Sequence, residues 1–114
     1  MNSLKKIFLL VMLSVASFSF SQSTDAGIAT IGENFCLVLD ADSEIQEHYV
    51  ANATGLNWTS AAAAVKMCGF HTNNLATYTA DYEKNQLLIH IHTDRTYESK
   101  DIAWWNQYLL SICK

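Results

Sequence analysis

The sequence predicts a small α+β domain in which a three-stranded sheet carries helices on one face. Three short runs with strand-like apolar patterns cover residues 35–39, 75–80 and 86–93, and apolar stripes at helical spacing lie between and after them. The expected order is strand, two helices, two strands and a final helix, which is typical of a truncated ferredoxin-like plait. This fold analogy does not by itself indicate a function.

The N-terminus predicts export. Lys5 and Lys6 precede an apolar run at residues 7–16, and small residues follow around Ser19 and Ser21. This is the pattern of a secretory signal peptide, and the run is too short for a stable membrane span. We therefore expect residues 1–21 to be removed and the mature protein to be periplasmic or extracellular.

The rest of the chain is long enough for one small domain. Residues 22–33 are small and polar, which predicts a flexible leader, and residues 34–114 are expected to form the single folded domain. Without the signal, the chain carries five basic and eleven acidic residues, a net charge of about −6. This balance argues against nucleic acid or an anionic membrane as a partner.

The first half of the domain contains an apolar strand at residues 35–39 and two expected helices. Ser43 and Gln46 match a capping box, so we expect a helix over residues 43–55. A second helix is expected to begin near Asn57 or Thr59 and to stop at Gly69. Its stripe consists of Trp58, Ala61, Ala62, Val65 and Cys68.

The second half predicts a hairpin and a closing helix. Residues 75–80 and 86–93 are the expected strands, and residues 81–85 form the polar connection between them. Ser99 is the expected cap of the last helix. The stripe of this helix consists of Ile102, Trp105, Tyr108, Leu109 and Ile112, which leaves Trp104 on its flank.

Three cysteines in an exported protein predict one disulfide and one remaining thiol. In the expected topology, the helices that end near Cys68 and Cys113 run in the same direction, so we expect these two residues to pair and Cys36 to stay free. The bridge would close a loop of about 45 residues and stabilise the fold by about 3–4 kcal/mol. The opposite strand register favours Cys36 with Cys68 instead.

His90 and His92 are the candidate metal ligands. They are two residues apart on an expected strand, so both imidazoles lie on the same face, as is common for Zn or Cu ligands. Further ligands would have to come from His48, Asp40, Asp42 or Asp94. A second possible zinc site combines His71 with the three cysteines, but an oxidising compartment favours a disulfide over thiolate ligands.

Two asparagines, Asn52 and Asn57, begin the sequons Asn-Ala-Thr and Asn-Trp-Thr, which are acceptors for N-glycosylation in eukaryotic secretion. Both fall in the segment expected to be helical. We therefore interpret them as chance matches.

The sequence lacks a nucleophile elbow, a recognisable triad and a glycine-rich phosphate loop, so it predicts no enzyme and no cofactor. The leading hypothesis is an exported, non-enzymatic binding or protein-interaction module that uses the open face of its sheet for self-association or for a protein partner. The alternative is a periplasmic Zn or Cu protein using His90 and His92, and the third is a small exported hydrolase. The expected binding face consists of Cys36, Val38, Tyr78, Leu88, His90, His92 and Trp104.

Overall fold

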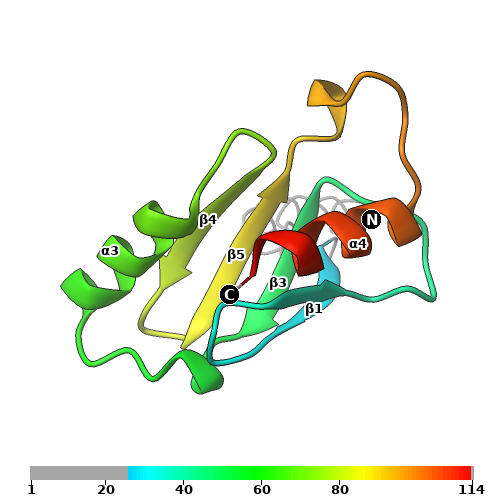
Figure 1. Ribbon diagram of the computed structural model, residues 1–114. Helices are drawn as coiled ribbons and strands as arrows, with labels where there is room; N and C mark the ends of the chain where they lie inside the picture. Colours follow the sequence, from blue (N-terminus) through cyan, green and yellow to red (C-terminus); the bar gives the residue numbers. More distant parts are fainter. Residues whose placement is uncertain (1–25, 114) are drawn as a thin grey trace, which may run out of the picture.

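The computed structural model describes residues 26–113, which form one α+β domain (Figure 1). The predicted signal peptide and its cleavage site lie outside these residues. The strands are β1 (Gly27–Ile31), β2 (Leu37–Leu39), β3 (His48–Asn52), β4 (Ala76–Asp81) and β5 (Gln86–Ile91). The helices are α3 (Ala61–His71) and α4 (Ile102–Ile112), with 3-10 turns η1 (Thr54–Leu56) and η2 (Thr93–Arg95).

The described strands form one mixed sheet in the order β2-β1-β3-β5-β4. β1 and β3 are parallel, and the other neighbouring pairs are antiparallel. α3 connects β3 to β4, and β5 lies between these two strands. The α+β class is confirmed, but the prediction of a three-stranded ferredoxin-like plait is wrong because the sheet has five strands.

The segment expected to be a flexible leader contains β1, a strand inside the sheet. Gly27, Ala29 and Ile31 face the core, whereas Ile28 and Thr30 are exposed, so the period is two. Gly27 has a packing role here, because a Cβ atom at this position would lie 2.6 Å from the ring of Tyr49. The small residues that resemble a linker therefore allow close packing between two paired strands.

The helix expected over residues 43–55 does not form. Residues 43–47 are irregular, and β3 follows with Tyr49 and Ala51 buried and His48 and Asn52 exposed. This alternation of period two is stronger than the helical stripe that the capping box suggested. Because residues 48–52 form a strand and not a helix, His48 lies beside His90, which matters for function.

Both remaining helix predictions are confirmed, with shifted caps. Ser60 caps α3, and its Oγ accepts a hydrogen bond from the Ala63 amide. Asp101 caps α4 by accepting from the Trp104 amide. Gly69 lies within α3 rather than ending it. Within residues 26–113, no helix is long and apolar enough to cross a bilayer.

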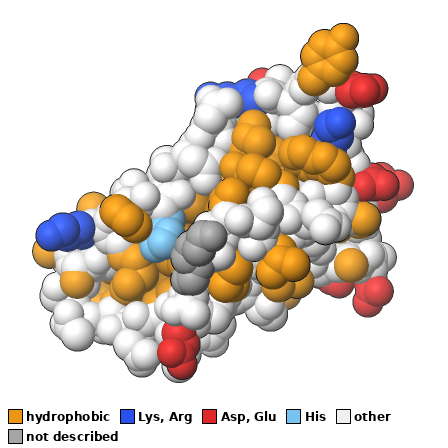
Figure 2. Space-filling model, viewed as in Figure 1, with side chains coloured by type: hydrophobic (Ala, Val, Ile, Leu, Met, Phe, Trp, Pro, Cys, Tyr) orange, Lys and Arg blue, Asp and Glu red, His pale blue; other side chains and the backbone are white. Residues whose placement is uncertain are grey.

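α3 and α4 both pack on the same face of the sheet, called here the covered face (Figure 1). Cys68 of α3 and Trp105 and Leu109 of α4 join one core with the inward residues of the strands. The strand residues in this core are Ala29, Ile31, Leu37, Leu39, Tyr49, Ala51, Ala76, Tyr78, Leu87, Ile89 and Ile91. On the outer side of the helices, hydrophobic side chains remain visible (Figure 2), and Val65, Phe70 and Leu110 are exposed.

A disulfide joins Cys36 to Cys113, and their Cα atoms are 4.9 Å apart. The predicted Cys68–Cys113 pairing is therefore wrong, and Cys68 is a buried free thiol. The reason is topological: α4 packs against β2, so its C-terminus meets the residue just before that strand. Burial raises the pKa of Cys68 to about 11, which makes this thiol unreactive.

Side chains occupy part of both sheet edges. On β2, the Asn106 carboxamide accepts from the Leu39 amide at 2.8 Å and donates to the Leu39 carbonyl at 3.1 Å. On β4, Asn73 Oδ1 accepts from the Ala76 amide, and Thr72 Oγ1 accepts from the Tyr78 amide. These contacts satisfy edge groups that would otherwise be available for pairing with another chain.

Candidate functional site

The other face of the sheet, called here the open face, carries three rows of side chains that run across the strands. The first row contains His48, His90 and Thr77, which are register neighbours on β3, β5 and β4. The middle row is mainly aliphatic and consists of Ile28, Val50, Leu88 and Thr79. The third row is polar and includes Asn52, Gln86 and Asp81.

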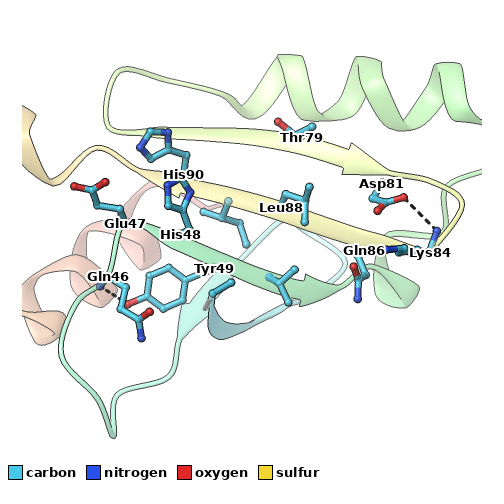
Figure 3. Close-up of a pocket in the computed structure, with 13 residues that line it drawn as sticks. Gln46, Glu47, His48, Tyr49, Thr79, Asp81, Lys84, Gln86, Leu88 and His90 are labelled. Carbon is cyan, nitrogen blue, oxygen red and sulfur yellow. Dashed lines mark hydrogen bonds between the residues drawn. The ribbon is translucent and has the colours of Figure 1, made fainter. Parts of the chain in front are cut away.

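The two histidines of the first row face each other across β3 and β5 (Figure 3). The Ile91 amide donates to the Glu47 carbonyl at 2.7 Å, so the next pair along the ladder, His48 and His90, is of the non-hydrogen-bonded type. Opposed side chains are closest in such pairs. The ring centroids of His48 and His90 are accordingly 4.5 Å apart.

Glu47 completes a group of three ligand side chains. One potential ligand atom each from Glu47, His48 and His90 lies within 4.8 Å of the others. Glu47 lies in a bend just before β3, so its carboxylate is not restricted by strand alternation, and one of its oxygens lies within 4.8 Å of the histidine ligand atoms. The hydrogen bond from the Ile91 amide to the Glu47 carbonyl holds the backbone of Glu47, and so fixes the position from which its side chain extends.

His92 is adjacent to this group without belonging to it. Its ring centroid is 4.2 Å from that of His90, and its Nε2 lies 2.7 Å from Thr77 Oγ1. Its pKa is lowered, mainly by desolvation and further by the positive charge of Arg95. The neutral imidazole, which is the metal-binding form, is therefore favoured at His92.

The structure separates the residues of the predicted binding face. Val38, Leu88 and His90 lie on the open face, and His92 follows at its edge. Tyr78 points to the covered face and is 6 % exposed, and Cys36 is tied into the disulfide. The predictions for these two residues are wrong, because Cys36 precedes β2 and the register of β4 turns Tyr78 inward.

Trp104 is also not part of the open face, because α4 lies on the opposite side of the sheet. Its ring is partly buried and stacks on Tyr108 with 5.7 Å between centroids. Lys100 Nζ lies 5.4 Å from the centre of the same ring. Trp104 therefore packs within the helix layer rather than serving the open face.

The other proposed ligands are not in the three-residue group. Asp40 and Asp42 lie in the exposed loop after β2, where Asp40 Oδ1 accepts from the Asp42 amide. Asp94 lies in η2. The zinc site with three cysteines is ruled out because the disulfide removes two thiolates, and His71 stacks on Phe35 with 4.0 Å between centroids.

The open face is also hollowed. A shallow concavity of about 710 Å³ extends over β3, β5 and β4. The histidines and Glu47 lie at one end, and Asp81, Lys84 and Gln86 lie at the other (Figure 3). Leu88 and Val50 form the floor between these ends.

Comparisons with protein-family models, curated proteins and solved structures found no significant match to this chain. The geometry of the open face is therefore the basis for inferring its function. Sequence reasoning named His48 only as one of several further ligands and missed Glu47. The alternation of residues 48–52, interpreted as a strand, was the signal that could have paired His48 with His90.

Proposed function

We propose that this chain is an exported, non-catalytic binding protein that holds a divalent transition-metal ion, Zn²⁺ or Cu²⁺, with Glu47, His48 and His90. The observation that carries the proposal is the convergence of these three side chains within 4.8 Å. Two come from directly opposed positions of paired strands, so rigid elements hold them.

The donor set suits borderline metal ions. Imidazole nitrogen is a common ligand of Zn and Cu, and a carboxylate oxygen completes mixed sites. Ligand atoms around a tetrahedral zinc ion lie about 3.3 Å apart, so the three ligand atoms have to approach one another by at most about 1.5 Å. Glu47 and His48 are exposed and His90 is half-buried, which leaves them room to rotate.

Three protein ligands leave one position of a tetrahedral shell for a fourth donor. The His92 ring lies 4.2 Å from that of His90, so His92 is the candidate for this position, and its use would require giving up the bond to Thr77. The general order of divalent affinities predicts tighter binding of Cu²⁺ than of Zn²⁺. Because protons compete with the metal ion for its ligands, affinity is expected to fall as the pH is lowered.

The test is calorimetric titration of chelator-treated mature protein with Zn²⁺ and with Cu²⁺, supported by native mass spectrometry. One ion per chain is expected. His48→Ala and His90→Ala are each expected to weaken binding by roughly 100-fold or more, because losing a direct ligand costs more than losing an outer partner. Glu47→Gln is expected to weaken it less, since the amide oxygen remains.

Matched controls separate the site from general surface charge. Glu44→Gln removes an exposed carboxylate three positions from Glu47, outside the proposed ligand set, and is expected to leave the affinity unchanged. His92→Ala tests the fourth position alone. Binding that persists in the His48→Ala/His90→Ala double variant, with wild-type affinity, contradicts the proposal.

A second candidate function is self-association through the open face, favoured by its aliphatic row. Ile28 is 59 % and Leu88 is 38 % exposed, and Val50 lies between them in register. Because side chains satisfy part of both sheet edges, we favour face-to-face contact with a second copy over strand pairing.

Leu88→Glu is the test of this second function, because it puts a charge in the middle of the row. We expect sedimentation to detect a dimer of the wild-type chain and a monomer of this variant. Val65→Glu, on the outer side of α3, is the control and should remain a dimer. A wild-type chain that stays monomeric at high concentration contradicts self-association.

A further inference from the structure

The two asparagine sequons lie on exposed local turns rather than within a helix. Asn52 is the last residue of β3, and Asn57 is the residue that ends η1. Both asparagines and both threonines, Thr54 and Thr59, are exposed. Their place in an expected helix, one of the two reasons for treating these sequons as chance matches, therefore no longer holds, and the other reason, that they serve only in eukaryotic secretion, is addressed by the test below.

The first sequon forms a compact turn. Asn52 Oδ1 accepts from the amide of Thr54 at 2.8 Å and from its hydroxyl at 2.5 Å. These bonds span only three residues, so this turn can form before the domain folds. N-linked transfer accepts such surface sequons during secretion.

The second sequon sits at a tight reversal. Asn57 has φ 53° and ψ 47°, a left-handed conformation that asparagine tolerates better than most residues. Its backbone amide donates to the Thr54 carbonyl at 3.2 Å, and its side-chain Nδ2 donates to the Gly55 carbonyl at 3.4 Å. Asn57 is exposed, and after attachment of a sugar its Nδ2 keeps one N–H for the bond to Gly55.

The disulfide adds an independent observation. Cys36–Cys113 pairs in the domain, and disulfides form in the compartment where N-glycosylation occurs. From the sequons, their exposure and this bridge, we infer that Asn52 and Asn57 are N-glycosylation sites. The inference does not depend on the metal proposal, because it uses none of its ligands.

The reaction is a group transfer from a lipid-linked oligosaccharide pyrophosphate. A bond forms between the Asn Nδ2 and the anomeric carbon of the sugar, and the bond from that carbon to the pyrophosphate oxygen breaks. The lipid pyrophosphate leaves, and the amide proton passes to the transferase that catalyses the step. No oxidant or reductant is required.

A glycan at Asn52 would shield one end of the open face. Asn52 lies in the polar row, four residues along β3 from His48, which is about 13 Å. The sugar would therefore cover the region of Gln86 and Asp81 and leave the histidine end accessible. This arrangement is compatible with metal binding at the histidine end.

The test is expression of the full chain in a eukaryotic secretory host and recovery from the medium. Intact mass is measured before and after peptide N-glycosidase, which converts each glycosylated Asn to Asp. Two glycans are expected on the wild type, one on N52Q, one on N57Q and none on N52Q/N57Q. T54S, which keeps the sequon, is expected to retain its glycan.

Y97N is the positive control, because it creates an Asn-Glu-Ser sequon at a residue that is 97 % exposed. A secreted Y97N chain that carries sugar at position 97 but none at Asn52 or Asn57 overturns the inference. Modification of only one native sequon overturns it for the other. Metal titration of the same glycosylated chain tests the metal proposal separately.

Discussion

The two faces of the sheet differ in what their side chains do. On the covered face, residues such as Leu87, Ile89 and Ile91 are at most 2 % exposed and pack against α3 and α4. On the open face, the alternate residues of the same strand, Leu88 and His90, remain partly accessible. A single strand thus supplies both the core and the candidate binding surface, because its side chains alternate.

The difference between the two faces predicts that substitutions on the covered face alter stability and that substitutions on the open face alter binding. The largest effect on stability is expected from the disulfide, which holds the end of α4 near the start of β2. Cys36→Ala/Cys113→Ala is expected to lower the free energy of unfolding by about 4 kcal/mol, since the bridge spans a separation of 77 residues. Urea denaturation measures this change.

Cys68→Ala is the control for that experiment, because Cys68 is free and keeps the bridge intact. We expect this substitution to lower the free energy of unfolding by only about 1 kcal/mol, because it makes a buried side chain smaller. A double variant as stable as the wild type, or a chain in which alkylation labels Cys36 and protects Cys68, contradicts the observed pairing.

Adjacent leucines on β5 compare the two faces directly. Leu87 is fully buried and Leu88 is 38 % exposed. Leu87→Ala leaves a cavity in the core and is expected to lower the free energy of unfolding by about 3 kcal/mol. Leu88→Ala is expected to lower it by less than about 1 kcal/mol. Equal losses in chemical denaturation would show that the open face is packed against another part of the protein in solution.

The smallest expected effect is the pH dependence of stability through His71. Burial lowers the pKa of this imidazole below its usual 6.5, so the folded state favours the neutral form. Below pH 6.5 the unfolded chain binds more protons than the folded one, and the free energy of unfolding therefore decreases as the pH falls. The dependence fades above that pH, because the imidazole becomes neutral in both states.

His71→Gln is expected to flatten this profile when thermal midpoints are compared at pH 7.5 and pH 5.5. The pKa of His92 is lowered as well, so His92→Gln is measured in parallel. A profile that keeps its full slope in the His71→Gln/His92→Gln double variant would assign the effect to other groups.

Sequence reasoning located the elements whose periodicity is strong. The hairpin of β4 and β5 and the helices α3 and α4 were predicted within a few residues. β1 and β3 were missed because each is five residues long, and small residues in β1 and a chance helical stripe near β3 resembled other structures. In such short strands, the alternation of buried and exposed residues becomes defined only when pairing with a neighbouring strand fixes which face is buried.

The candidate site was predicted in part. His90 and His92 were named from their spacing, and His48 was one of several possible partners. Glu47 was missed, because a residue in a bend carries no periodic signal that indicates where its side chain points. The pairing of β3 with β5 decides which of the candidate ligands are neighbours.

Local spacing along the chain is sufficient to predict the α+β class, the hairpin, the two helices and the alternation that gives β5 a covered and an open face. The strand order, the Cys36–Cys113 bridge and the meeting of Glu47, His48 and His90 are visible only in the folded domain. Each of these joins residues far apart in the chain. Such contacts depend on how the whole core packs, which no local pattern specifies.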